Sequence, residues 1–266
     1  MTIVWIGAGN LATQLGMALA RAGHETLQVF SRTEASASAL AARLRCPFTC
    51  RAEEVVGGAD VYLFSVKDSA LEELVARVAP RAGHALCLHT AGSMPMDVFR
   101  GHAAHYGVWY PMQTFSRTVD VGFREIPAFI EASDGPSLAL VRRLAASVSE
   151  RVMEMSTEKR RHLHLAAVFA CNFTNHCYAL SAEILEKEGI PFEVMLPLID
   201  ETARKVHRLA PRDAQTGPAV RYDHNVIGRQ AALLGEENGL RELYEQMSRS
   251  IHRLALREEK EGGKKK

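Results

Sequence analysis

Residues 2–22 read TIVWIGAGNLATQLGMALARA, and this stretch decides the fold. A short apolar run leads directly into GAGNLA and then into an apolar-periodic helix, which is the context that the dinucleotide-binding turn G-x-G-x-x-G/A requires. The first glycine permits the tight turn, the second lets the backbone approach a pyrophosphate, and the final alanine allows the helix to pack closely on the strand. Because the helix N-terminus then faces the phosphates, the predicted phosphate-binding residues are Gly7, Ala8, Gly9, Asn10 and Leu11.

The rest of the chain divides into two parts by the pattern that it shows. Up to residue 155, short apolar runs such as Leu27–Phe30 and Val61–Val66 alternate with helical patterns, which predicts parallel strands joined by crossovers. From residue 156 the pattern is helical, with breaks at glycine and proline. We therefore expect an α/β fold: a doubly wound Rossmann-type sheet (1–155), an all-helical domain (156–257) and a charged, flexible tail (258–266). The cleft between the domains is the expected site.

Composition and charge narrow the class of protein. The chain has 266 residues, of which 47% are hydrophobic and 24% charged, as in ordinary globular proteins. Its formal net charge of +1 predicts no affinity for nucleic acids or membranes. The start carries no signal-peptide pattern, and no apolar run has the length of a transmembrane helix. Five cysteines without a CxxC pair indicate reduced thiols and hence a cytoplasmic protein.

The end of the second predicted strand indicates which dinucleotide binds. NAD-preferring sites usually place an acidic residue there to hold the ribose 2′-hydroxyl, whereas this sequence reads VFSRTE (29–34). Ser31 and Thr33 can hydrogen-bond a 2′-phosphate and Arg32 can pair with it, so NADP(H) is the predicted cofactor. The alternative is a plain surface arginine at a strand end.

Three loops follow strands at the edge of the sheet where ligands bind in this fold. In SVKDS (65–69), the residues Ser65, Val66 and Lys67 are predicted to line the nicotinamide ribose. The loops LHTAGSMP (88–95) and WYPMQTFS (109–116) hold further candidates for the site, namely His89, Thr90, Ser93, Tyr110, Gln113 and Thr114. Since glycine, serine and proline are turn residues in any case, turn formation is the alternative for all three loops.

A helix with polar residues on an apolar background opens the second part. HLHLAAVFACNFTNHCY (162–178) has the apolar content of a buried helix, yet buried polar groups without partners cost about 1–3 kcal/mol each. At about 100° per residue, His164, Val168, Cys171 and Asn175 share an arc of about 60°, and Asn172 borders it. This face is predicted to look at the nicotinamide; the alternative is a solvated or dimer-facing stripe. Metal binding is disfavoured because no pair of ligand residues has i, i+4 spacing.

A polar loop, AQTGPAVRYDHN (214–225), interrupts the later helices. Thr216 and Arg221 are predicted substrate contacts, since an arginine in such a loop suits a carboxylate or a phosphate. The alternative is that Arg221 and Asp223 brace the loop.

Several of these stretches together resemble one bacterial family over residues 1 to about 257: GAGNLA, SRT, LHTAGSMP, YPMQTFS, HLAAVFACNFTNH and QTGPAVRYDHN. Members of that family join an N-terminal Rossmann-like NADP-binding domain to a C-terminal helical domain of unknown function, and are labelled NADP-dependent oxidoreductases. The family is similar in layout to pyrroline-5-carboxylate reductase, to 3-hydroxyacid and 6-phosphogluconate dehydrogenases, and to deazaflavin-dependent NADP oxidoreductase. The resemblance implies a 6-phosphogluconate-dehydrogenase-like layout and a homodimer formed through the helical domain.

The sequence also departs from these relatives. The 3-hydroxyacid dehydrogenases carry a catalytic lysine four residues before an asparagine, and if Asn172 is that asparagine, the lysine position is Val168. Pyrroline-5-carboxylate reductase needs no such lysine, because a protonated imine is already electrophilic. Its own substrate signature is, however, not evident in this chain.

The resulting hypothesis is an NADP(H)-dependent oxidoreductase that moves a hydride to or from a small polar metabolite, at a C=N or C=O group, in the interdomain cleft. His89 and His164 are the candidate proton donors, with Tyr110 as a further alternative, and Asn172 and Asn175 would orient the substrate. One rival hypothesis is a non-catalytic NADP(H)-binding sensor. Another is an enzyme that passes the hydride to a flavin or deazaflavin, which rests on fold analogy alone.

Overall fold

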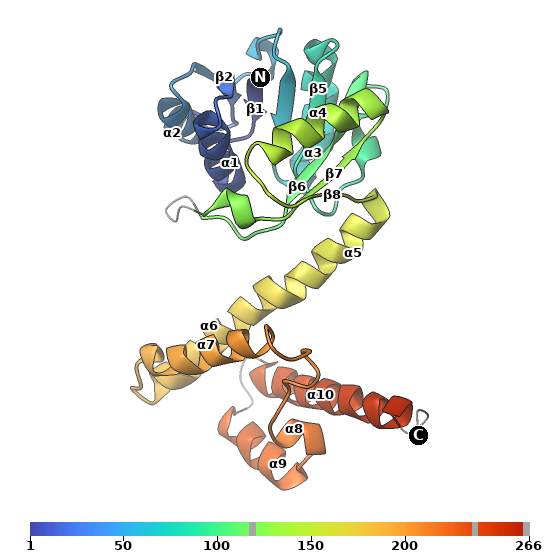
Figure 1. The fold of residues 1–266 in the computed structure, drawn as a ribbon. Coiled ribbons are helices and arrows are strands. Elements are labelled where there is room, and N and C mark those ends of the chain that lie inside the picture. Colours follow the sequence, from blue (N-terminus) through green and yellow to red (C-terminus); the bar gives the residue numbers. More distant parts are fainter. Residues whose placement is uncertain (117–120, 236–238, 263–266) are drawn as a thin grey trace. The chain divides into compact units, whose positions relative to one another are not determined.

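An eight-stranded sheet forms the centre of the first of two compact units, Met1–Cys177 and Tyr178–Lys266. The computed structural model describes residues 1–116, 121–235 and 239–262, with side chains to residue 257. The strands are β1 (Thr2–Ile6), β2 (Glu25–Phe30), β3 (Phe48–Thr49), β4 (Val61–Phe64), β5 (Leu86–His89), β6 (His105–Pro111), β7 (Ala128–Ala132) and β8 (Val152–Glu154). Their order is β3-β2-β1-β4-β5-β6-β7-β8, so the doubly wound Rossmann-type sheet is confirmed (Figure 1).

Two features of the sheet differ from the expected pattern. β7 runs antiparallel to β6, with Trp109 opposite Ile130. Antiparallel neighbours need no helical crossover, and in its described part the connection holds only the 3₁₀ helix η4 (Phe123–Glu125). The edge strand β3 is the other difference, because two residues are too few to produce a readable alternation of apolar and polar side chains.

Helices cover both faces of the sheet, because its central strands are apolar on both sides. On one face lie α1 (Asn10–Arg21), α2 (Glu34–Leu44) and α4 (Gly135–Ala146), in a buried cluster that includes Trp5 and Trp109. The other face is covered by α3 (Asp68–Val78) and the 3₁₀ helices η1 (Ala52–Glu54), η2 (Ala79–Ala82) and η3 (Met96–Phe99). β1 and β4 are neighbours whose following helices, α1 and α3, lie on opposite faces, so their carboxyl ends form the switch point at which ligands bind.

A long helical run follows β8 and changes its type partway. α5 (Thr157–Ala167) begins after Ser156, whose side chain accepts a hydrogen bond from the Lys159 amide at 3.4 Å. It continues into a π-helical turn, η5 (Val168–Phe173), and then into α6 (Thr174–Lys187). A π-helical bond spans five residues, so residues beyond the turn are rotated relative to an ordinary helix. The grouping of Asn175 with His164, which assumed 100° per residue throughout, is therefore wrong beyond the π turn.

The expected domain boundary falls where the strands end and the helices begin. By contacts, however, α5 and the π turn group with the sheet, and the first compact unit extends to Cys177. A boundary between folding domains at residue 155 stays a prediction.

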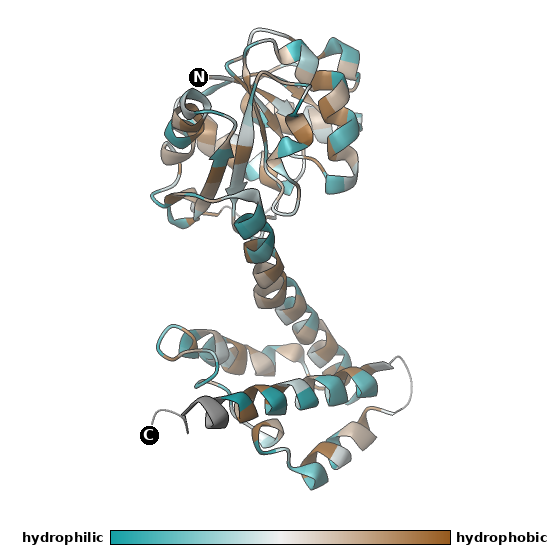
Figure 2. Cartoon of the chain, turned by 90° about the vertical axis from the view of Figure 1, so that its right-hand side faces the viewer, coloured by the Kyte–Doolittle hydropathy of each residue, from teal (hydrophilic) through white to brown (hydrophobic). Residues whose placement is uncertain are grey.

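The second unit is helical, and the described side chains of this unit are mostly exposed. It contains η6 (Phe192–Met195), α7 (Leu196–Lys205), α8 (Pro218–Arg221), α9 (His224–Leu233) and α10 (Leu240–Gly262). Among its described side chains only Ile227, Ala231 and Ser248 are buried, whereas apolar side chains such as Leu198 and Val206 are exposed. Figure 2 shows that hydrophobic and hydrophilic residues alternate along its helices. Helix α10 reaches into the segment expected to be a flexible tail, and residues 263–266 of that tail lie outside the described residues. Within the described ranges, no helix combines the length and apolarity needed to cross a bilayer.

Candidate functional site

The turn after β1 is built on a close approach between two strands. The amide of Gly7 donates a hydrogen bond to the carbonyl oxygen of Phe30 at 2.8 Å, and Gly7 has a φ of +113°. A Cβ on Gly7 would lie 2.1 Å from the carbonyl oxygen of Ser65, so a side chain does not fit there. Gly9 differs, because its φ is −78° and no described atom lies within 4 Å of the position of a Cβ. Gly7 is therefore needed for the turn itself, whereas Gly9 leaves room in front of the N-terminus of α1.

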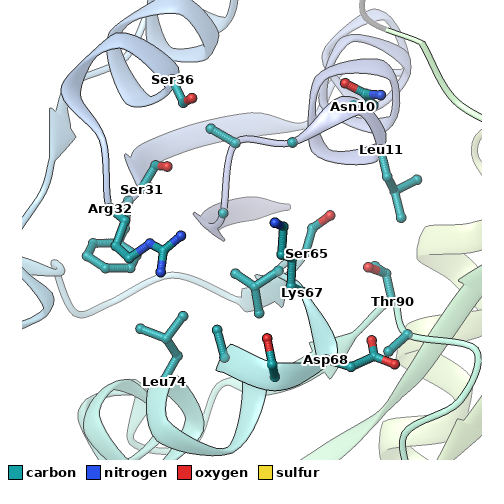
Figure 3. A pocket seen from close by; sticks show the side chains of 18 of the residues that line it. Asn10, Leu11, Ser31, Arg32, Ser36, Ser65, Lys67, Asp68, Leu74 and Thr90 are labelled. Carbon is teal, nitrogen blue, oxygen red and sulfur yellow. The ribbon is translucent and has the colours of Figure 1, made fainter.

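A pocket of about 630 Å³ opens at this switch point (Figure 3). The loops after β1, β2, β4 and β5 form its walls, as the fold predicts for a dinucleotide site. Every residue that was predicted to bind the cofactor lines this one pocket: Gly7, Ala8, Gly9, Asn10, Leu11, Ser31, Arg32, Thr33, Ser65, Val66 and Lys67. Asn10 is in addition tied to the loop after β6, because its side-chain amide donates to the carbonyl oxygen of Phe115 at 2.9 Å.

One side of the pocket carries hydroxyls and a guanidinium. Figure 3 shows Ser31, Arg32 and Ser36 gathered there, and Thr33 lines the same pocket. Ser36 lies in the first turn of α2 and was not predicted; a hydroxyl just inside the helix after the second strand is the feature that could have identified it. These side chains fit a 2′-phosphate, since an arginine and several hydroxyls can bind its oxygens.

The opposite side of the pocket connects the loops after β4 and β5. Asp68, at the start of α3, accepts a hydrogen bond from the hydroxyl of Ser93. Thr90 is buried, and its amide donates to the carbonyl oxygen of Phe64 at 3.1 Å. Thr90 and Ser93, both predicted substrate contacts, therefore lie in the wall of the first pocket, together with Asp68, which the sequence did not single out.

Two further residues of this wall contact each other. The phenolic oxygen of Tyr110, near the end of β6, lies 3.0 Å from Nδ1 of His164 on α5, and the two rings meet edge to face. Burial raises the pKa of Tyr110, and the positive charge of Arg160 opposes that rise. Gly92 makes room for the imidazole, since a Cβ there would lie 2.5 Å from its Nδ1. The Tyr110–His164 pair thus places two groups that can exchange a proton in the wall of the pocket.

A second cavity, of about 560 Å³, shares this pair with the first pocket, because Tyr110 and His164 line both. Its remaining walls come from the chain after β6 and from α5 and the π turn: Met112, Gln113, Thr114, Leu163, Ala166, Ala167, Val168, Ala170, Cys171 and Asn172. The structure thus brings Gln113, Thr114 and Asn172 together with His164. Asn175 is exposed and is not among the lining residues, in keeping with the rotation that the π turn introduces.

His89 lies elsewhere than the sequence suggested. It is fully buried, its ring stacks on Phe99, and its Nδ1 accepts a hydrogen bond from the Ala91 amide at 3.2 Å. Its Nε2 lies 3.2 Å from the carbonyl oxygen of Pro95. Burial, with the nearby charge of Arg160, lowers the pKa of His89 to about 3, so this ring is neutral at neutral pH. The geometry gives His89 a role in shaping the loop after β5, which does not agree with the predicted role as proton donor.

Arg160 was not predicted, yet it is the most buried charged residue near the site. Its side chain is 1% exposed, and Nη1 donates to Oε2 of Glu131, on β7, at 2.6 Å. Nη2 donates to the carbonyl oxygen of Met94 at 2.6 Å and to Oγ1 of Thr157 at 3.2 Å. In the stretch TEKRRHLHL (157–165), nothing distinguishes Arg160 from the exposed Arg161 except its i, i+4 spacing from His164.

Two predicted substrate contacts belong to the second unit. Thr216 and Arg221 are both exposed, and Arg221 ends α8. Asp223 caps α9, because its carboxylate accepts from the Val226 amide at 3.2 Å, so this residue does brace the loop. A role of Thr216 and Arg221 in substrate binding stays a prediction.

Comparison with known proteins gives matches over most of the chain. Residues 1–108 match the model of a Rossmann-like domain, and residues 126–251 match that of a domain of unknown function, DUF2520. A Bacteroides fragilis protein named as an NADP oxidoreductase is 54% identical, over 95% of this chain and 98% of that one, with a TM-score of 0.92. No curated protein matches the chain.

Two more distant structures share the fold. A Thermotoga maritima protein is 21% identical over 95% of this chain and 99% of that one, with a TM-score of 0.77. An imine reductase from Myxococcus stipitatus, solved in complex with NADP+, is 18% identical over 98% of this chain and 95% of that one, with a TM-score of 0.68.

Substitution of the two glycines of the turn should affect different properties, namely NADPH affinity at Gly9 and the free energy of unfolding at Gly7. Gly9→Ala should leave the free energy of unfolding nearly unchanged and weaken NADPH binding by roughly tenfold or more, because the methyl group occupies the space a pyrophosphate needs. Gly7→Ala should destabilise the fold by at least about 1–3 kcal/mol through backbone strain and the clash with Ser65. Thermal unfolding and a fluorescence titration with NADPH measure both effects. Unchanged NADPH affinity in a folded Gly9→Ala variant would contradict the assignment of this pocket.

Proposed function

Because the chain belongs to the family in which a Rossmann-like domain precedes DUF2520, we propose that it is an NADP(H)-dependent oxidoreductase acting on a small compound with a C=N or C=O group. The observation that carries this proposal is the Tyr110–His164 contact, whose two residues line both the first pocket and the second cavity. A reductase needs a proton source between its cofactor and its substrate, whereas a sensor of the cofactor state does not. The 54% identity to a protein named as an NADP oxidoreductase supports the same conclusion.

The first pocket would hold the cofactor. Gly9 and the N-terminus of α1 would face the pyrophosphate, and the hydroxyls and guanidinium of residues 31–33 and 36 would bind the 2′-phosphate. Ser65, Val66 and Lys67 would lie along the nicotinamide ribose. When bound, NADPH supplies the hydride.

Tyr110 and His164 would supply the proton that accompanies the hydride. For Tyr110 to donate its phenolic proton to the substrate nitrogen or oxygen, Nδ1 of His164 must carry the hydrogen of their mutual contact. Nδ1 of His164 can then return its proton to the phenolate while Nε2 takes a proton from solvent, so the imidazole does not become an anion. If Asn172 corresponds to the asparagine of the 3-hydroxyacid dehydrogenases, Val168 takes the place of their lysine; it lines the second cavity and cannot exchange a proton.

The second cavity would hold the substrate. Gln113, Thr114 and Asn172 offer neutral hydrogen-bonding groups on its wall, and Leu163 and Val168 offer apolar surface. Asn172 would therefore orient the substrate instead of exchanging a proton with it. The position of the site in an interdomain cleft, the contributions of Asn175, Thr216 and Arg221, and the cytoplasmic location stay predictions.

We also propose that the protein is a homodimer formed through its helical unit. Apolar side chains of this unit are strongly exposed, among them Val194 at 56%, Leu198 at 60% and Val206 at 50%. Exposed apolar surface on this scale is typical of an oligomer interface.

Replacement of Arg32 should change cofactor preference. Arg32→Ala should weaken NADPH binding by about 1.5–3 kcal/mol, roughly tenfold to a hundredfold, through the loss of a charge-assisted contact with the 2′-phosphate. NADH binding should stay nearly unchanged, because NADH lacks that phosphate. Parallel fluorescence titrations with both cofactors measure the effect, and Arg51→Ala, an exposed arginine outside the pocket, is the control. Equal loss for both cofactors would contradict the assignment.

Removal of the phenolic hydroxyl should slow turnover without affecting cofactor binding. With the wild-type protein, NADPH oxidation is first screened against imines and carbonyl compounds. Tyr110→Phe should then lower kcat by about 10²–10⁴, the usual contribution of a general acid, and His164→Ala should lower it as well. Affinity for NADPH should stay nearly the same in both variants. Full activity of Tyr110→Phe would remove the hydroxyl from the mechanism. If none of the screened compounds supports NADPH oxidation by the wild-type protein, the reductase proposal is contradicted.

The dimer proposal predicts a native mass of about twice 29.3 kDa by analytical ultracentrifugation. Leu198→Glu should lower that mass, because it places a charge on the apolar surface of α7. Val56→Glu is the matched control, since Val56 is an exposed apolar residue of the first unit. A wild-type protein that sediments as a monomer would contradict the proposal.

A further inference from the structure

Arg160 is a buried cation in the first turn of α5, and stability does not account for it. Its side chain is 1% exposed, and its partner Glu131 is 19% exposed. A buried ion pair seldom stabilises a fold more than well-packed apolar residues of the same size would, because both charges lose their hydration. The contacts of Arg160 instead connect it to the site beside it.

The contacts of Arg160 fix the start of α5 against two separate parts of the sheet. Glu131 comes from β7, and it also accepts hydrogen bonds from the amide of Thr157 at 2.9 Å and from its hydroxyl at 2.7 Å. Met94, whose carbonyl oxygen Arg160 binds, belongs to the loop after β5, and the Met96 amide of η3 donates to Oγ1 of Thr157 at 3.2 Å. The guanidinium thus joins β7, the first turn of α5 and the loop that contains Gly92.

His164 lies one helical turn after Arg160, on the same face of α5. Gly92, in the loop that Arg160 holds, sits directly against the His164 ring, and Nδ1 of that ring contacts Tyr110. A shift of either the helix start or the loop would therefore separate His164 from Tyr110. The position of the pair depends on the contacts of Arg160.

The charge of Arg160 also acts on the pair. Burial raises the pKa of Tyr110 and the Arg160 charge lowers it. Tyr110 also contacts His164 on α5. The other charged groups nearby are Glu131 on β7, which pairs with Arg160, and Lys67 and Asp68, which line the first pocket together with Tyr110. When Tyr110 gives its proton to a substrate, a phenolate remains, and a fixed positive charge stabilises a phenolate.

We propose that Arg160 is a positioning residue of the oxidoreductase site, which holds Tyr110 and His164 together and offsets the negative charge left on Tyr110 after proton donation. The inference rests on the proposed function, since it assigns the proton to Tyr110. Arg160 itself touches neither substrate nor cofactor in this scheme. Its effect is exerted through Tyr110 and His164.

Two variants that break the same ion pair separate this role from a merely structural one. Arg160→Met removes the cation and leaves the anion, so the pKa of Tyr110 should rise. Glu131→Gln removes the anion and keeps the cation, so the pKa of Tyr110 should not rise. Arg160→Lys, which retains the charge, should restore the wild-type behaviour in part. The pKa of Tyr110 in the wild type and in each variant is measured by an NMR titration of protein labelled at tyrosine Cζ, in complex with NADP+. The Tyr110 signal is assigned by its loss in Tyr110→Phe.

The outcomes differ clearly. A Tyr110 pKa that rises in Arg160→Met and does not rise in Glu131→Gln supports the proposal. Equal shifts of the Tyr110 pKa in both variants, or no shift in either, overturn it. If Arg160→Met does not fold, the double variant Arg160→Met/Glu131→Met, which leaves no unpaired charge, is compared with Glu131→Met; a Tyr110 pKa that is no higher in the double variant than in Glu131→Met then overturns the proposal. Because the titration needs no substrate, it remains decisive when no compound is reduced, which is the separate failure of the proposed function.

Discussion

The ion pair between Arg160 and Glu131 is the contact on which the arrangement of the site depends. After β8 the chain leaves the sheet as a helix. The position of such a helix relative to the sheet is fixed only when its first turn is anchored. Here the guanidinium reaches β7 and the loop after β5 at once, and Thr157 adds hydrogen bonds to both. The anchoring of one helical turn therefore sets where His164 stands relative to Tyr110.

Close backbone approaches complete the site at two glycines. Gly7 allows the chain after β1 to pass the carbonyl of Ser65, which brings the loops after β1 and β4 together around the first pocket. Gly92 allows the loop after β5 to lie against the His164 ring. In both cases the absence of a Cβ allows two segments to approach closely, so the pocket and the Tyr110–His164 pair each depend on a glycine.

The cofactor half of the site could be predicted from the sequence because its features are local. A strand, a glycine-rich turn and a helix follow one another within residues 2–22, and Ser31–Thr33 follow the next strand directly. The proton-donating half depends on contacts between distant residues, which one sequence does not reveal. From the sequence alone, Arg160 cannot be distinguished from an exposed charge in the first turn of a helix. His89 likewise cannot be distinguished from an accessible imidazole at a strand end until its burial and its backbone partners are known.

The π turn explains why a single helix carries polar residues that do not share one face. His164 and Asn172 lie before and within the turn and line the second cavity, whereas Asn175 follows it and is not among the lining residues. On a wheel of about 100° per residue, Phe169 and Phe173 lie roughly opposite His164, and here they contact each other edge to face and remain half exposed or more. The wider turn changes the angle between the residues before it and those after it, so it moves Asn175 away from the face that carries His164. The expectation of a buried helix in 162–178 is not met: every side chain of this stretch is exposed or half-buried, so its polar groups do not carry the cost of burial without partners.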